Sequence, residues 1–233
     1  MPSTRPAHGL SGPLTSPSKD GIGPHGRVEI FATRGRPEIK AEGLLSAQGG
    51  VKVYSTCDLD FSKCDILQVE DVKNVIVNAG KDRLISGIAT GAIHVICRMA
   101  IGDRGTLPTD PTVPKQVDAT MTGLYNEVHR ADTELVVLGI GTADKHEVKF
   151  IKTFSAVDVP LTAFSNPGAP VINEVGLITA DLTTGSPLPR LPVSSPNAPD
   201  ADEALFAVRT YKSVPFEAAN DISVTVRYTI YVE

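Results

Sequence analysis

Hydrophobic and polar residues alternate along much of this chain, and the alternation predicts a protein built mainly of strands. The clearest case closes the sequence, where every second residue from Ile222 to Val232 is apolar or aromatic and most residues between them are polar. Because successive side chains of a strand point to opposite faces, this pattern is typical of a long half-buried strand. We expect it to lie in the interior of a sheet.

Nine shorter apolar runs, each bounded by turn residues, predict further strands. The run 92–101 is almost continuously apolar, which indicates a strand covered on both faces. Prolines at 108, 111 and 114 exclude regular ladder hydrogen bonds in the polar stretch that follows it. The runs are 28–33, 51–54, 66–69, 74–77, 92–101, 135–140, 146–154, 171–178 and 205–211.

One segment, residues 78–90, changes from the period of a strand to that of a helix. Leu84, Ile85 and Ile88 share one helical face, and Asn78 is a candidate N-cap. Strands without long helices between them favour an all-β fold. We therefore predict an antiparallel β-sandwich of jelly-roll or Greek-key type with one short helix.

The first 26 residues differ in composition from the rest. Their five prolines and many glycines and serines cannot nucleate a helix or a central strand. This stretch therefore predicts an extended N-terminal arm, which either has no role or docks on a neighbouring subunit. The expected organisation is an arm over residues 1–26, a β-rich extension over residues 27–73 and a β-sandwich domain over residues 74–233.

Composition and charge exclude several classes of protein. Tryptophan is absent, so the core depends on aliphatic side chains. The net charge is −5 and the basic residues are scattered, which argues against a nucleic-acid partner. No apolar run approaches the ~18 residues of a membrane span, and Arg5 has no apolar h-region behind it, so we expect no secretory signal. We expect no membrane partner and synthesis in a cytoplasm.

The search for catalytic or cofactor motifs is negative. Residues Gly21–Gly26 match G-x-G-x-x-G, but a proline-rich arm precedes them and a strand follows, the reverse of the strand-to-helix order that holds a dinucleotide. Serine-hydrolase, zinc-protease and P-loop motifs are absent from the sequence. We expect a protein that is not an enzyme and binds no cofactor.

Two residue groups were weighed as metal ligands. Asp58, Asp60 and Asp65 lack the glycine and the glutamate of a calcium loop and are expected to be surface carboxylates. Cys57, Cys64 and Cys97 could join His94 in a zinc site, but their spacing is wrong and structural cysteines are favoured. Intermolecular disulfides are a third alternative, because three cysteines are an odd number.

From about residue 74 onward the sequence resembles a broad group of tailed-bacteriophage virion proteins, which includes neck and collar proteins, tail decoration proteins and attachment domains of tail fibres. The likeness is a series of short motifs in the same order along residues 74–233, ending in the alternating strand. The other motifs are Asn74–Gly80, Met99–Asp103, Leu124–Arg130 and Glu174–Leu177.

The resemblance implies a non-enzymatic structural component of a virion, assembled in the bacterial cytoplasm as a symmetric homo-oligomer around the neck, collar or tail and in contact with other virion proteins. It singles out Asp103, Glu127, Arg130 and Glu174 as structural or interface residues that fix loops against the sheet or bridge subunits. Ordinary solvated charges are the alternative for them. A receptor- or carbohydrate-binding module of a tail fibre or baseplate is the alternative function.

Overall fold

The computed structural model describes residues 25–48, 51–92, 94–142, 145–181 and 203–232. Most of the predicted arm lies outside these ranges. His25 and Gly26, which the prediction placed in the arm, belong to the first strand. The strands are β1 His25–Arg34, β2 Glu38–Gln48, β3 Val51–Asp60, β4 Asp65–Lys73, β5 Val75–Ile76, β6 His94–Gly102, β7 Thr106–Leu107, β8 Asp110–Pro114, β9 Glu127–Asp132, β10 Leu135–Thr142, β11 Lys145–Ser155, β12 Val171–Asp181, β13 Glu203–Pro215 and β14 Ile222–Val232.

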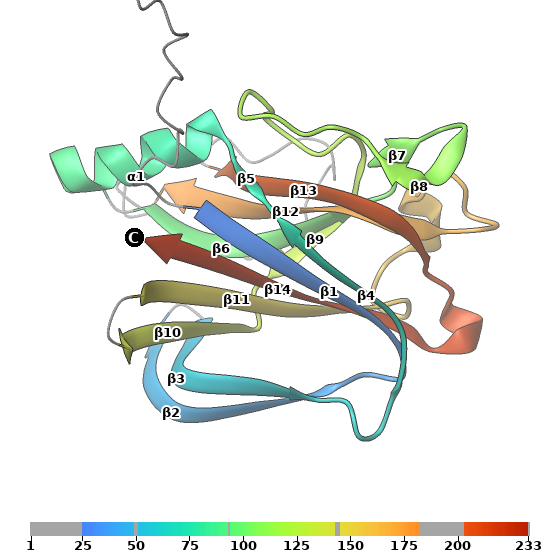
Figure 1. Ribbon diagram of the computed structural model, residues 1–233, viewed down its shortest axis with the longest axis horizontal. Helices are drawn as coiled ribbons and strands as arrows, with labels where there is room; N and C mark the ends of the chain where they lie inside the picture. Colours follow the sequence, from blue (N-terminus) through green and yellow to red (C-terminus); the bar gives the residue numbers. More distant parts are fainter. Residues whose placement is uncertain (1–24, 49–50, 93, 143–144, 182–202, 233) are drawn as a thin grey trace, which may run out of the picture.

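Two packed sheets confirm the predicted all-β sandwich (Figure 1). The larger sheet has the strand order β2-β3-β10-β11-β14-β1-β4, and the smaller one has the order β5-β13-β12-β6-β9. All the pairings are antiparallel except the short one between β10 and β3, which is parallel. The four strands β1 to β4, which include the predicted extension over residues 27–73, all belong to the larger sheet, and β1 lies beside the C-terminal strand β14.

The main core lies between the two sheets. From the larger sheet, β1 contributes Val28 and Ile30 and β14 contributes Val226 and Tyr228, all essentially inaccessible to solvent. The smaller sheet faces them with side chains such as Met99, and the Tyr228 hydroxyl donates to the Val175 carbonyl oxygen at 3.2 Å. Aliphatic side chains supply most of this core, as the composition predicts.

Strand β14 is interior, as predicted, between β11 and β1. The expectation that its polar face meets solvent is wrong. Ser223, Thr225 and Thr229 are buried, and the hydroxyls of Thr225 and Thr153 lie 3.0 Å apart. Arg227 on this face pairs with both carboxylate oxygens of Glu29. Period two predicted the strand correctly, but it cannot show that a second layer covers the polar side.

The covering segment is the hairpin β2–β3, which forms one end of the larger sheet and curls back over the outer face of that same sheet (Figure 1). Leu59 and Ile39 of this region pack with Leu135 and Ile151, on the face of the sheet that points away from the main core. Strand β2 was not predicted, because its charged residues interrupt the apolar pattern. The sandwich is therefore covered on one side by its own hairpin.

Helix α1, Asn78–Thr90, has the predicted bounds but not the predicted orientation. Val77 rather than Asn78 occupies the N-cap position. The side chain of Ile88 is 88% exposed, and Leu84 and Ile85 are exposed with it. Gly80 is the one buried residue of the helix, because a Cβ there would lie 2.4 Å from the Phe206 carbonyl oxygen. Close backbone contact, not the apolar stripe, holds the helix to the sheet.

Two further segments differ from the prediction. The proline-rich stretch forms a short ribbon of β7 and β8, with Thr106 opposite Pro114. Strand β9 was also not predicted, because its charged residues hide the alternation. Two 3-10 turns, η1 Leu161–Ala163 and η2 Ala218–Asn220, complete the structure. No helix in the described ranges has the length and apolar character of a membrane span.

Candidate functional site

The four residues singled out from the sequence lie at one end and on one face of the smaller sheet. Glu174 is central and fully buried on β12. Its Oε1 accepts the backbone N–H groups of Arg104, at 3.2 Å, and Asn126, at 2.9 Å, and its Oε2 accepts that of Tyr125 at 2.7 Å. One carboxylate thus fastens both ends of the long connection between β6 and β9. Gly102 permits this approach, because a Cβ there would lie 2.5 Å from Glu174 Oε1.

Neighbouring polar side chains fasten the same connection. Asn126 Nδ2 donates to Asp103 Oδ1 at 2.7 Å, and the Ser165 backbone N–H donates to the other oxygen of Asp103. The Asn173 side-chain oxygen accepts the Gly105 N–H at 2.6 Å, while its Nδ2 donates to the Thr106 hydroxyl at 3.0 Å. Side chains of β12 therefore accept hydrogen bonds from backbone N–H groups at both ends of the connection, where it meets the sheet.

Buried charges link the strands beside this connection. Arg130 and Glu127, both on β9, form a two-point ion pair, with Arg130 Nη2 2.8 Å from Glu127 Oε2. Glu203 of β13 accepts from Arg130 and, at 2.6 Å, from Arg98 of β6. Arg98 also reaches Asp132 at 3.1 Å, whose side chain is 67% exposed. The network thus runs from a fully buried carboxylate to the surface.

Burial is the largest cause of the pKa shifts of Glu127 and Glu174. Burial raises the pKa of Glu127, and the ion pair with Arg130 offsets only part of that shift. Burial also raises the pKa of Glu174, although its three backbone N–H partners act in the opposite direction. Burial lowers the pKa of Arg130, but the adjacent carboxylates outweigh it and raise that pKa overall. Arg130 therefore stays charged.

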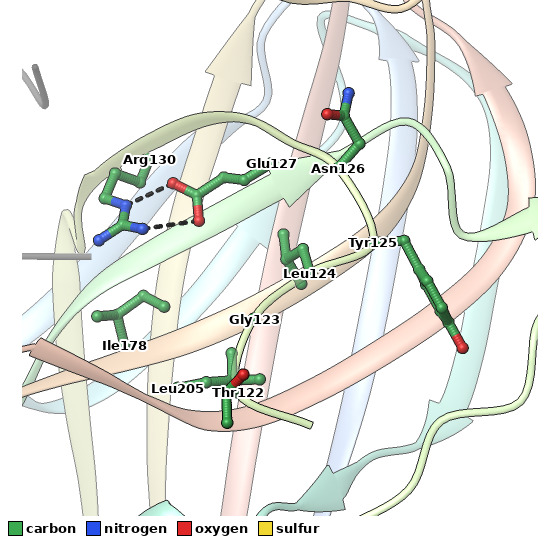
Figure 2. A pocket seen from close by; sticks show the side chains of 9 residues that line it. All are labelled: Thr122, Gly123, Leu124, Tyr125, Asn126, Glu127, Arg130, Ile178 and Leu205. Atoms are coloured by element: carbon green, nitrogen blue, oxygen red, sulfur yellow. Dashed lines mark hydrogen bonds and ion pairs between the residues drawn. The ribbon is translucent and has the colours of Figure 1, made fainter. Parts of the chain in front are cut away.

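A hollow of about 200 Å³ adjoins the ion pair (Figure 2). Its lining comes from Thr122–Glu127 together with Arg130, Ile178 and Leu205. Leu124 packs against the apolar cluster that contains Ile178 and Leu205, whereas Tyr125 points away from them in Figure 2. The Tyr125 hydroxyl instead donates to the Gln116 carbonyl oxygen, and Lys115 Nζ lies 4.5 Å from the ring centre. The charged groups beside the hollow, Glu127 and Arg130, are already paired with each other. The arrangement therefore fixes a loop in place.

The residues weighed as metal ligands do not converge. Within the described ranges, no group of three or more histidine, cysteine or acidic side chains could hold a metal ion. Asp60 pairs with Lys40, and Cys57 and Cys64 are free, half-buried thiols. Burial raises the pKa of both thiols, which keeps them protonated near neutral pH. The Cys97 side chain lies outside what the structure describes.

The sequence reasoning missed three members of the polar network: Arg98, Asn173 and Glu203. Arg98 gave a usable signal, because a charge within an apolar run covered on both faces requires a buried partner. Glu203 gave none. Its contacts with β6 and β9 depend on the pairing of β13 with β12, which local sequence does not encode.

Comparison with known proteins adds no relative. The chain matches no protein-family model, and a search among curated proteins finds no match to it. The structure therefore shows where Asp103, Glu127, Arg130 and Glu174 lie, but no relative assigns a function to them. Their contribution between copies of the chain stays a prediction.

Loss of the Glu203 charge should be far more costly than loss of the Asp132 charge. Glu203→Gln leaves two buried arginines short of a carboxylate and should lower the free energy of unfolding by about 3 kcal/mol or more. Asp132→Asn removes an exposed partner of the same Arg98 and should change the free energy of unfolding by less than about 1 kcal/mol. Urea unfolding of both variants measures the difference, and equal effects would contradict the description of a buried network.

The raised pKa of Glu174 predicts a specific pH dependence. A carboxyl group whose folded-state pKa is raised stabilises the fold fully below its unfolded-state pKa, and this contribution is lost as pH rises through the folded-state pKa. Glu174→Gln cannot ionise and also turns an N–H donor toward a backbone N–H, which should cost about 1–3 kcal/mol.

The stability advantage of wild type over Glu174→Gln should thus be largest near pH 4 and shrink toward pH 7. Urea unfolding at four pH values measures it, with exposed Glu42→Gln as the control for removal of one charge. An advantage that grows with pH would contradict the raised pKa of Glu174. It would mean that the three backbone N–H groups lower this pKa more than burial raises it.

Proposed function

We propose that this protein is a non-enzymatic structural component of a tailed-phage virion, which assembles as a symmetric oligomer around the neck, collar or tail. The motifs along residues 74–233 suggest the class of particle. The geometry supports the mode of action, which is contact between copies and with neighbouring virion proteins. Sheet edges and the proline-rich connection between β6 and β9 supply the contact surfaces.

The observation that carries the proposal is the state of edge strand β4. Ile66, Leu67 and Val69 on this strand are each about half exposed, at 50%, 47% and 51%. An edge strand offers unpaired backbone groups to any other strand, so soluble monomers usually protect such edges with charge, proline or a covering segment. Strand β4 has charged residues too, but it exposes these aliphatic side chains beside them, and the other edge strand, β2, exposes Leu44 and Leu45. Exposed aliphatic side chains along the edges of a sheet favour a partner.

The clamped connection supplies a second kind of surface. The ribbon β7–β8 exposes Leu107 and Val113 at the end of the sandwich, and Lys115 Nζ donates to the Arg104 carbonyl oxygen at 2.5 Å. Because buried Glu174 and Asn173 hold this region, it would lose little conformational entropy on association. A surface fixed in advance suits a protein that must fit identical neighbours in a closed symmetric assembly.

Association in solution should depend on the aliphatic side chains of β4. Val69→Lys places a charge on the edge and should weaken self-association by about tenfold or more without changing the unfolding transition. Val157→Lys makes the same chemical change at an exposed valine in the turn after β11 and should leave association intact. Light scattering over a range of concentrations gives the mass, and a protein that is monomeric at every concentration contradicts the proposal.

A second candidate function, a receptor- or carbohydrate-binding module, is favoured by one observation. The rings of His25 and Tyr231 stack with centroids 5.2 Å apart, beside a hollow of about 350 Å³ lined by Arg27, Asp71 and Lys73. Sugar-binding sites combine an aromatic ring, on which the sugar stacks, with hydrogen-bonding side chains, and this hollow has both.

A glycan array distinguishes this candidate from assembly alone. If the module binds a glycan, Tyr231→Ala should abolish the signal because it removes the stacking face. Tyr125→Ala, which changes an exposed tyrosine elsewhere, should leave the signal unchanged. An array without specific binding would reject this second function and leave the structural one untouched.

A further inference from the structure

We propose that helix α1 forms a two-fold contact with α1 of a second copy of the chain, in which the apolar stripes of two antiparallel helices pack together and Ile85 of each copy enters a hollow of the other. This inference rests on the proposed function and deepens it, because it names a surface through which the symmetric assembly forms and the residues that meet there.

The apolar stripe of α1 is unusually exposed for a helix that packs on a sheet. Ile88 is the most exposed large hydrophobic side chain that the structure describes, at 88%, and Ile85 is 62% exposed. The aliphatic side chains on the edge strands β2 and β4 reach at most 58%. Lys81, Leu84, Ile85 and Ile88 have the spacing i, i+3, i+4, i+7, so they share one face. Such a stripe usually faces a core, whereas α1 contacts its own sheet through a glycine, which leaves the stripe for a partner.

A hollow of about 320 Å³ lies beside this stripe. Leu84, Gly87 and Ile88 line it from the helix. Phe150 of β11 and Phe206 of β13, which belong to the main core, line it from the two sheets. This volume is at the lower end of the range of small-ligand pockets, so the hollow can admit an aliphatic side chain. One surface therefore carries both a projecting isoleucine and an apolar hollow, and a two-fold interface requires such a self-complementary surface.

The charges of α1 favour an antiparallel pair. Arg83 lies off the stripe, with its Nη1 3.0 Å from His94 Nδ1, whereas Lys81 lies on the stripe. Two parallel helices would place their lysines side by side. A helix C-terminus attracts cations, and the last turn of α1 has no basic residue. In an antiparallel pair centred at Ser86, Lys81 of each copy lies level with Gly91 at the C-terminal end of the other helix and supplies that cation.

The same register places Ile85 opposite a position without a side chain. Ile85 of one helix lies level with Gly87 of the other, and Leu84 lies level with Ile88. Gly87 lines the hollow, so the isoleucine meets an opening rather than a projecting side chain. A contact that lacks a Cβ on one side also lets two helices approach closely. Charge and shape therefore favour one and the same arrangement.

Sedimentation equilibrium of the full chain tests the contact with matched lysine variants. Ile88→Lys should weaken the helix contact by about tenfold or more, and Lys81→Glu by about three- to tenfold. Val157→Lys makes the equivalent change at a valine that is 80% exposed and should have no effect. Neither lysine variant should alter urea unfolding, because both replaced side chains are exposed. Val69→Lys protein, with its sheet edge blocked, should still form dimers, and the addition of Ile88→Lys should leave monomers.

Fluorescence identifies what covers the stripe. The chain has no tryptophan, so Ile85→Trp introduces a single reporter. Its emission should shift to shorter wavelength as protein concentration rises, because the indole leaves water for the hollow of a second copy. Val157→Trp, in the exposed turn after β11, should keep the emission of an exposed indole at every concentration.

The remaining outcomes separate this inference from the proposed function. A short-wavelength emission that does not depend on concentration assigns the stripe to the chain's own residues and overturns the inference. Association that Ile88→Lys and Lys81→Glu both leave unchanged also overturns it, and an effect of Ile88→Lys alone overturns the antiparallel register. If Val69→Lys still lowers the mass in these cases, the proposed function survives. A wild type that stays monomeric at all concentrations overturns both.

Discussion

Burial of β14 on both faces is the constraint on which the rest of the fold depends. Its apolar face closes the main core, and on its other face Thr225 and Thr229 are buried and Arg227 pairs with Glu29 of β1. β14 is also hydrogen-bonded to both β1 and β11, so the N-terminal and central parts of the chain meet through it. With the middle of the sheet fixed in this way, β2 and β4 are its outermost strands among the described residues.

The polar network plays the corresponding part in the smaller sheet. Glu174 and Asn173 of β12 satisfy backbone groups of the long connection between β6 and β9, which has little apolar surface with which to hold itself in place. Glu203 joins the arginines of β6 and β9 across the intervening strand. A buried ion pair often adds little net stability, whereas the removal of one partner is strongly destabilising because the other charge is left buried and unpaired. A loop fixed in this way is suited to contact surfaces.

Local sequence predicted the strands well and their environment less well. The period-two pattern of β14 and the apolar run of β6 are properties of the strands themselves, and both predictions are confirmed. The burial of Thr225 and the exposure of Ile88 depend on which distant segment lies over them. Glu174 was recognisable as a charge among apolar neighbours, whereas Glu203 acquires its meaning only through strand pairing. Helix α1 shows that an apolar stripe need not face the core when a glycine provides the contact.

Amide exchange at β14 under native conditions tests the central claim most directly. If this strand is interior and covered on both faces, its amides exchange only when the whole protein unfolds, and their protection equals the free energy of global unfolding. The strands β1 and β11 should share that protection, while β2 exchanges much faster. Amides of β14 that exchange as quickly as those of β2 would contradict the account.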